Sequence, residues 1–554
     1  MRIYRPVAVF LLSLAASLCV IGQSGAVAQA DPGPATDAAN STLEGKTPAA
    51  TDLRAEVEEL RQLVHEQQKR IEALEAERKP TPPQVEVNAS AAPGSEQLDA
   101  DATSLPAASP SQSPAASQNV QAGSTDERIR NLERQIKGLG PISFSGDVRL
   151  RAEPFFGGPT DQSLDRARAR IRARFNATAD LGSQFRTGFS LATGDVNDPV
   201  STNANVTGFY TRKAIALDQA FVEFRPSKFQ ALTLTGGKFR YPWVNTELTW
   251  DKDLNPEGAA ETLGFKLNTP VLKRIAIVGF QLPFAEIAGI SPAGKRIAQQ
   301  ITYGGQVQTS LALGPRITLG VYSGLYDFRA ADAIALALAR ASSKNPQTPW
   351  SGLLPLNSST GVQNSLYTTT ATTIITVDGT AYPTGVSSVT NAQFASKFSL
   401  FDNLVMLDIK TGSARFPVSF IGDYVQNTQA CANLANIAPA PTNTAAQTFK
   451  QTLNAPCNPH QRRGYWAEAS VGRLQEKGDV QFDYARIYIE REAVLGNFNY
   501  SELRQGTNVT QHRFEVFYQF DRSVQLGFTA LVGRPLATTE PWLTRLQFDT
   551  TYIF

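Results

Sequence analysis

Residues 166–175 read Arg-Ala-Arg-Ala-Arg-Ile-Arg-Ala-Arg-Phe, so charged and apolar side chains alternate without a break. In an extended strand, successive side chains point to opposite faces, and the five arginines would therefore share one face. That face must meet water, because a buried unpaired charge costs several kcal/mol. We expect a strand that is wet on one side and apolar on the other, as in a membrane barrel with a water-filled lumen. The alternatives are an edge strand of a soluble sheet and a basic patch for nucleic acid.

The overall charge argues against nucleic acid as a partner. The formal net charge of the 554 residues is +2, whereas nucleic-acid-binding proteins usually carry a large basic excess. Any basic function is therefore local.

The N-terminus predicts export. Residues 1–30 form a signal peptide, in which Arg2 and Arg5 precede an apolar run and small residues offer cleavage after Ala28 or Ala30. Two cysteines remain after cleavage, Cys431 and Cys457. In an oxidising compartment this even number favours a disulfide over two free thiols.

An arm follows the signal peptide. After a flexible segment at 31–51, apolar residues in four-three spacing predict a coiled coil over 52–78, which requires self-association. Residues 79–124 are rich in Pro, Ala and Ser and predict a disordered linker. A short helix is expected over 125–140, ending before Pro141. We expect the arm in the periplasm, and a contact with peptidoglycan is an open alternative for it.

The remaining chain, 142–554, predicts an all-β fold: a transmembrane antiparallel barrel of about sixteen strands with short turns at one rim and long loops at the other. The alternative is an exported soluble β-protein. The count is even only if Phe394 to Asp408 is one long strand. The expected strands are 142–153, 165–180, 184–194, 216–226, 229–239, 260–269, 272–283, 299–313, 316–328, 392–408, 417–427, 464–474, 480–490, 509–520, 524–533 and 542–554.

The chain ends on an alternating strand with Tyr552 and Phe554 on its apolar face. Together with Asp-Gln-Ala-Phe-Val-Glu-Phe at 218–224, Pro-Val-Ser-Phe-Ile-Gly-Asp-Tyr-Val-Gln-Asn at 417–427 and Gly-Thr-Asn at 506–508, this strand resembles the putative-porin family of bacterial outer membranes, which is distantly similar to phosphate-selective porins. The resemblance covers nearly everything from Ile142 onward. It implies a passive channel in outer-membrane lipid, a homotrimer, and a C-terminal signal for the barrel-insertion machinery.

The arginines predict a basic wall along the lumen, which would concentrate anions. Two loops could oppose it with carboxylates, and a loop that folds inward would create a transverse field with a weak anion preference; true anion specificity is the alternative. The predicted pore-lining residues are Arg149, Arg151, Arg166, Arg168, Arg170, Arg172, Arg174 and Arg186. The candidate constriction-loop residues are Asp195, Asp198, Asp251, Asp253, Glu257 and Glu261.

Catalysis is not expected, and neither is a cofactor or a metal. No metal-ligand spacing or nucleophile elbow is present, which leaves only a weak case for a hydrolase using His512 with Ser501 or Ser523. The functional alternative to a diffusion porin is a structural anchor that tethers the envelope through the coiled-coil arm.

Overall fold

The computed structural model describes residues 142–554, apart from 207, 287–298, 343–363 and 378–379. The predicted signal peptide, flexible segment, coiled coil, linker and short helix lie outside the described residues. No helix among the described residues has the length and hydropathy needed to cross a membrane.

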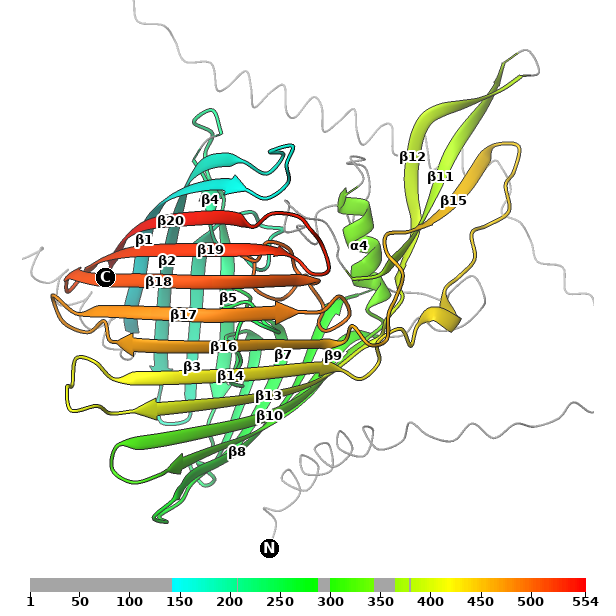
Figure 1. Ribbon diagram of the computed structural model, residues 1–554. Helices are drawn as coiled ribbons and strands as arrows, with labels where there is room; N and C mark the ends of the chain where they lie inside the picture. Colours follow the sequence, from blue (N-terminus) through cyan, green and yellow to red (C-terminus); the bar gives the residue numbers. More distant parts are fainter. Residues whose placement is uncertain (1–141, 207, 287–298, 343–363, 378–379) are drawn as a thin grey trace, which may run out of the picture. The chain divides into compact units, whose positions relative to one another are not determined.

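Sixteen long antiparallel strands form one closed barrel, as the sequence predicted (Figure 1). The first strand pairs on one side with the second and on the other with the last, which closes the sheet. The barrel strands are β1 (Ile142–Gly157), β2 (Arg166–Leu181), β3 (Phe185–Thr193), β5 (Ile215–Phe224), β6 (Leu232–Lys238), β7 (Glu257–Lys266), β8 (Leu272–Ala285), β9 (Gln300–Ala312), β10 (Ile317–Arg329), β13 (Phe398–Ile409), β14 (Val418–Asn427), β16 (Arg463–Gly472), β17 (Val480–Ile489), β18 (Val509–Asp521), β19 (Val524–Pro535) and β20 (Leu543–Ile553).

The two rims of the barrel differ. Connections such as 182–184 and 522–523 at one rim are short, whereas the other rim carries loops such as 194–214, 239–256 and 490–508. A two-residue strand, β4 (Ala204–Asn205), lies within the first of these loops and pairs with β2. The backbone of Phe554 exchanges two hydrogen bonds with that of Gly146, so both ends of the barrel lie at the short-turn rim.

One strand boundary was wrong. The prediction made 392–408 a single strand, but β13 begins at Phe398, and the residues before it belong to a separate sheet. That three-stranded sheet consists of β11 (Leu366–Val377), β12 (Thr380–Phe394) and β15 (Gln447–Leu453). The Thr/Ser-rich segment could form its own sheet because it lies in the long loop between β10 and β13, outside the barrel wall (Figure 1).

Two short helices and a disulfide also lie at the long-loop rim. The helices are α4 (Asp332–Ser342) and η1 (Leu434–Asn436). A disulfide joins Cys431 to Cys457 within the loop that carries β15. The sequence did not predict α4.

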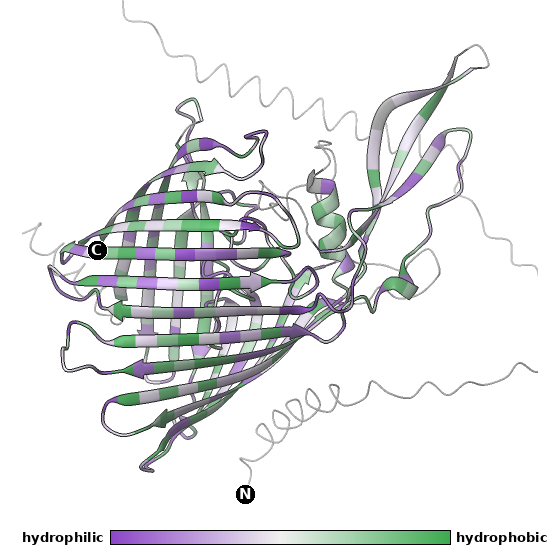
Figure 2. Cartoon of the chain, viewed as in Figure 1, coloured by the Kyte–Doolittle hydropathy of each residue, from purple (hydrophilic) through white to green (hydrophobic). Residues whose placement is uncertain are grey.

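Hydrophilic and hydrophobic residues alternate along the barrel strands (Figure 2). On β1 the side chains of Val148 and Leu150 point outward and are exposed, whereas those of Arg149 and Arg151 point inward and are buried. An apolar outer face and a charged inner face are what a barrel in lipid requires.

The lumen is not polar throughout. Loop 239–256 folds inward, and its Trp243 stacks on Phe280 of β8 with ring centroids 4.0 Å apart. Trp250 of the same loop stacks on Phe328 of β10 at 5.5 Å. Residues of α4, among them Leu338, belong to the same apolar cluster. The inner face is therefore apolar along parts of β8 and β10, and the charged side chains of the lumen gather on other strands.

Candidate functional site

The arginines of β1 and β2 face each other across one strand pair. Arg149 lies opposite Arg172, and Arg151 lies opposite Arg170. Four like charges at this spacing repel one another. The arrangement therefore needs carboxylates from elsewhere in the fold.

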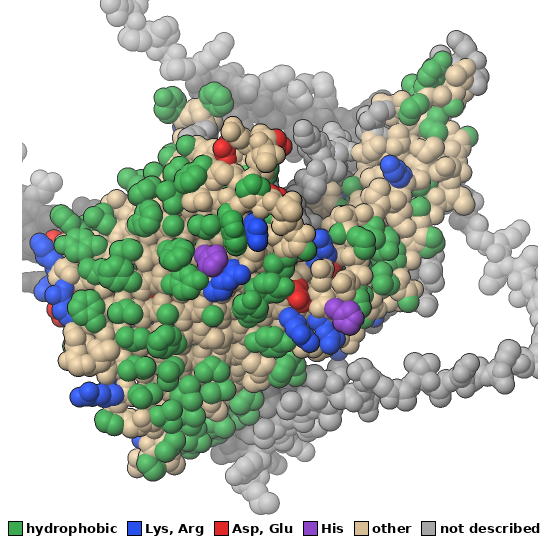
Figure 3. All heavy atoms as spheres, in the orientation of Figure 1, with side chains coloured by type: hydrophobic (Ala, Val, Ile, Leu, Met, Phe, Trp, Pro, Cys, Tyr) green, Lys and Arg blue, Asp and Glu red, His purple; other side chains and the backbone are tan. Residues whose placement is uncertain are grey.

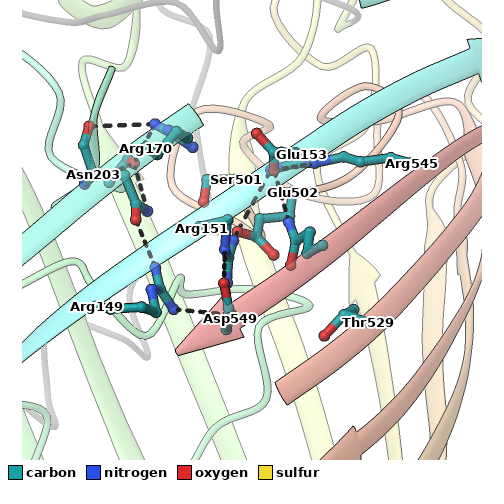
Figure 4. Close-up of polar contacts among 12 residues, drawn as sticks. Arg149, Arg151, Glu153, Arg170, Asn203, Ser501, Glu502, Thr529, Arg545 and Asp549 are labelled. Carbon is teal, nitrogen blue, oxygen red and sulfur yellow. Dashed lines mark hydrogen bonds and ion pairs between the residues drawn. The ribbon is translucent and has the colours of Figure 1, made fainter. Parts of the chain in front are cut away.

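Carboxylates on β1 and β20 neutralise part of the positive charge of these arginines (Figure 4). Asp549 of β20 accepts two hydrogen bonds of 2.7 Å from Arg151. Glu153 of β1 pairs with Arg168 on β2 and with Arg545 on β20. These groups are inward-facing neighbours on three adjacent strands, so the barrel closure itself assembles them.

At the short-turn end of the same wall, Asp147 of β1 pairs with two arginines. Its Oδ2 accepts a hydrogen bond of 2.8 Å from Arg172, and its Oδ1 accepts one of 2.6 Å from Arg174. Asp253 of loop 239–256 adds a longer ion pair of 3.7 Å with Arg174. Burial disfavours the charge on Asp253, but Lys252 and the wall arginines lower the pKa of its carboxyl. This loop thus meets the basic wall, as a constriction loop would.

A second loop also reaches the wall. Glu502, in loop 490–508, contacts Arg151 at 2.5 Å and Arg545 at 3.5 Å (Figure 4). Burial opposes its ionisation, but Arg151 and Arg545 hold the pKa of Glu502 well below its usual range. Glu502 is therefore a permanent negative charge against the wall.

Arg149 and Arg170 lack a close carboxylate partner. Arg149 donates to the side-chain oxygen of Asn203 at 2.6 Å and lies 3.9 Å from Asp549, which is already held by Arg151. Among the described residues, Arg170 donates only to Ser201 Oγ and to the backbone oxygen of Asn203, each at 3.3 Å. The Nε atoms of both arginines are buried without a hydrogen-bond partner among the described residues.

An acidic cluster lies on the inner face of β16 to β18. Arg513 of β18 pairs with Glu247, Glu468 and Glu515 at 2.8 to 3.3 Å. Lys252 pairs with Glu247 at 3.2 Å. Asp483 lies directly opposite Glu515 in the strand register, on the same inner face. Carboxylates therefore exceed cations on this side of the lumen.

Loop 239–256 is fixed to the barrel wall opposite the arginines. Thr246 donates a hydrogen bond of 2.5 Å to Asp423 on β14, and Thr249 donates one of 3.1 Å to Asp402 on β13. The side chain of Gln306 on β9 donates to the backbone oxygen of Val244 at 2.7 Å. These contacts and the tryptophan stacks hold the loop across the lumen.

Three cavities adjoin these groups. One of about 350 Å³ is lined by Arg149, Arg172 and Asp549, and one of about 280 Å³ by Glu502 and Arg545. Arg151 stands between them, because it contacts both Asp549 and Glu502. The third, of about 750 Å³, lies beneath α4 and is lined by residues of loop 194–214 and of β8.

The structure places some predicted residues away from the wall contacts. Arg166 lies over the ring of Phe155 at 4.5 Å, and Arg186 lies 4.0 Å from Asp180 at the short-turn rim. Asp195 and Asp198 line the cavity of about 750 Å³. Burial raises the pKa of the Asp198 carboxyl to about 6.

Loop 239–256, the candidate constriction loop, contains only two of the four acidic residues expected on it. Asp251 accepts a hydrogen bond of 2.7 Å from the backbone N–H of Ser501, and Asp253 meets Arg174. The prediction that Glu257 and Glu261 lie on this loop was wrong, because both belong to β7. Glu257 pairs with Lys238 at 3.2 Å. Glu261 shares the outward face with its cross-strand partner Gly279.

Several residues of the site were missed. Glu153, Arg545 and Asp549 follow the same alternation as the predicted arginines and could have been found on that signal. Glu502 and Asn203 lie in loops, where no periodicity marks them. No group of three metal-ligating side chains is present among the residues that the structure describes.

A closed sixteen-strand barrel with an apolar exterior and a charged, loop-narrowed lumen defines the outer-membrane porin class. The family described as "Putative porin" matches residues 145–552, and the chain belongs to that family. It is therefore a protein of the bacterial outer membrane, with its short turns on the periplasmic side and its long loops outside.

Solved structures of outer-membrane channels are similar to this chain at low identity. Pseudomonas putida OprB is 10% identical, covering 77% of this chain and 97% of its own, with a TM-score of 0.41. Salmonella typhi OmpF, solved with daunomycin, is 6% identical, covering 76% and 99%, with a TM-score of 0.40. Acinetobacter baumannii DcaP is 11% identical, covering 76% and 98%, with a TM-score of 0.36. None of the curated proteins matches this sequence.

Proposed function

We propose that this porin lets small hydrophilic solutes and ions diffuse passively across the outer membrane, with a weak preference for anions. The supporting observation is an imbalance of charge on the inner wall formed by β1, β2 and β20. Eight arginines, Arg166 among them, lie there with five carboxylates, of which Glu502 and Asp253 come from the inward loops. The surplus charge favours the entry of anions.

Arg149 and Arg170 carry two of the surplus charges. Neither has a carboxylate closer than 3.9 Å among the described residues, and each has a buried Nε without a partner. A guanidinium with free N–H donors binds a carboxylate or phosphate group through charge-assisted hydrogen bonds. These two arginines would give a passing anion a transient site between the loops and the wall.

The preference is weak in this proposal, because the acidic cluster of β16 to β18 lies on a different side of the lumen. The basic wall and the acidic cluster would create a field across the pore rather than one uniform potential. Cations would pass along the acidic side and anions along the basic side. Strict anion specificity would require a lumen without this cluster.

The proposed assembly is a homotrimer. The predicted coiled-coil seam, which one chain cannot satisfy alone, supports self-association. The barrel itself would need the insertion machinery, for which Tyr552 and Phe554 are the proposed signal. A contact of the arm with peptidoglycan remains a proposal for the same segment.

The test is ion selectivity in a planar lipid bilayer under a KCl gradient. The variant Arg149→Gln/Arg170→Gln should move the reversal potential toward cation preference without closing the channel. The matched control, Arg225→Gln/Arg329→Gln, removes two charges that are about half exposed at the two rims and should leave the potential unchanged. An unchanged potential in the first variant would contradict the anion preference. A protein without any conductance would instead favour the envelope anchor.

A further inference from the structure

The outward face of the barrel carries a second group of basic side chains, unrelated to the lumen. Arg486 on β17 lies directly opposite His512 on β18. On β19, Arg534 is two residues from Val532, the partner of His512. Figure 3 shows a histidine and Lys or Arg side chains among the apolar side chains of this face. We call Arg486, His512 and Arg534 the outer basic patch.

The patch faces outward because it follows the alternation of its strands. Arg486 shares a face with Phe482 and Tyr484, both exposed, whereas Ala485 and Ile487 are buried against the lumen. Arg534 likewise continues the outward series of β19, which includes Leu526. These arginines therefore point toward the lipid.

Aromatic neighbours place the patch near the outer edge of the apolar band. On β17, Arg486 stands between Tyr484 and Tyr488 on the same face, and Tyr484 contacts His512 through a hydrogen bond of 2.9 Å. Arg534 lies over the ring of Trp542 at 4.6 Å. Outer-membrane barrels carry aromatic girdles at the lipid–water interfaces, where a charge costs roughly 0–1 kcal/mol instead of about 2–4 kcal/mol at the midplane. The patch thus lies at headgroup level on the side of the long loops.

Neither arginine has an acidic partner within the described residues. Arg486 donates only to the backbone oxygens of Ile487 and Gln511, each at 3.3 Å, and Arg534 makes the ring contact alone. Glu490, four residues beyond Arg486 on the same face, accepts a hydrogen bond from the backbone N–H of Arg463. Two guanidinium groups therefore face the headgroup region without a counter-ion from the part of the chain that the structure describes.

We propose that the outer basic patch binds the phosphate groups of a lipid headgroup in the outer leaflet. Guanidinium groups bind phosphate through paired, charge-assisted hydrogen bonds, and basic pockets at membrane interfaces bind anionic headgroups. β17 and β19 are two strand spacings apart, roughly 10 Å. A headgroup with two phosphates can therefore engage both arginines, while Trp542 and Tyr488 pack against its apolar portion.

The test uses the purified full-length protein in detergent and lipid A carrying two phosphates as the probe, with bound lipid counted by native mass spectrometry. Arg486→Gln/Arg534→Gln should bind the probe at least tenfold more weakly than the unaltered protein. Arg522→Gln/Lys477→Gln is the matched control, since it removes two charges from turns at the opposite rim and should bind normally. Heat-dependent mobility on gels verifies that each barrel is folded.

Two further measurements distinguish a phosphorylated lipid headgroup from other sources of phosphate. Dephosphorylated lipid A should bind weakly to the unaltered protein and equally weakly to the patch variant, while millimolar inorganic phosphate should not displace the probe. Arg486→Lys/Arg534→Lys, which keeps the charge and is the milder change for folding, should retain part of the binding. Equal binding of the probe by all variants, or an equal loss with the phosphorylated and dephosphorylated lipids, would overturn the proposal.

Discussion

The guanidinium of Arg151 and the carboxylate of Glu502 lie 2.5 Å apart, although 351 residues separate them in the chain. The contact fastens loop 490–508 to the first strand of the barrel. It also places a negative charge at the centre of the basic wall, where Glu502 additionally reaches Arg545. The loop therefore sets how much of the wall's charge a passing ion experiences.

Replacing Glu502 by Gln should strengthen the anion preference. The substitution removes one negative charge from the wall while Arg151 keeps its two hydrogen bonds to Asp549. The reversal potential in a KCl gradient should shift toward the anion side. The free energy of unfolding should fall by about 1–3 kcal/mol, the usual cost of losing a charge-assisted hydrogen bond.

Glu540→Gln is the control for that variant. Glu540 pairs with Arg504 at 2.8 Å in the loops at the rim, and Glu540 itself lines none of the cavities described above. It should lower stability slightly and leave the reversal potential unchanged. A potential that responds equally to both variants would contradict the role given to Glu502.

The anion preference should increase as the pH falls through about 6. Burial raises the pKa of Asp198 from 3.8 to about 6, so its carboxyl is charged at pH 7 and neutral at pH 5. Protonation removes a negative charge whose field reaches Arg170. Because the folded-state pKa is raised, ionisation of Asp198 opposes folding, and stability should rise as the pH falls from 7 toward 4.

Asp198→Asn isolates the contribution of this carboxyl. The variant should show the low-pH selectivity already at pH 7 and no step near pH 6 in the reversal potential. If the variant kept the full step near pH 6, the step would belong to another titrating group.

The sequence predicted the barrel well because lipid and water impose a period of two on every strand. Each predicted strand corresponds to one barrel strand, and the wrong boundary at Phe398 arose where Thr- and Ser-rich segments alternate weakly. The inner face of β8 is apolar instead of polar. Phe280 stacks on Trp243 of the inward loop, and Val278 belongs to the same apolar cluster, so neither side chain faces water. Such contacts depend on a loop whose path no local pattern encodes.

The site could be predicted only in part for the same reason. Alternation alone identified Arg149 and Arg170 as members of an inner face. Their partners depend on closure of the barrel and on two long loops, so nothing local links Arg151 to Glu502 or Arg174 to Asp253. The sequence predicts which face of a strand carries a charged side chain, whereas the partner that neutralises the charge depends on the tertiary structure.

Removing the disulfide should loosen the outer loop without changing conduction. Closing a loop with the observed separation of 26 residues lowers the entropy of the unfolded segment by an amount equivalent to about 3.5 kcal/mol. Cys431→Ser/Cys457→Ser should therefore speed tryptic cleavage within 428–462, at Lys450 and Arg462. Single-channel conductance should match that of the unaltered protein, because the bridge lies outside the barrel wall. Unchanged cleavage would show that the sheet contacts of β15 hold the loop alone.

Gly304→Ala should destabilise the barrel from inside. A Cβ at this position of β9 would meet the ring of Phe280, which is itself stacked on Trp243. The ring cannot move aside without disturbing the inward loop, so the free energy of unfolding should fall by about 1–3 kcal/mol, the usual cost of overpacking. The temperature at which the folded form disappears on gels measures the effect. Gly422→Ala is the matched control, because a Cβ there has no neighbour within 4 Å. If both variants lost the folded form at the same temperature, the cost would belong to glycine replacement in a strand and not to the Phe280 contact.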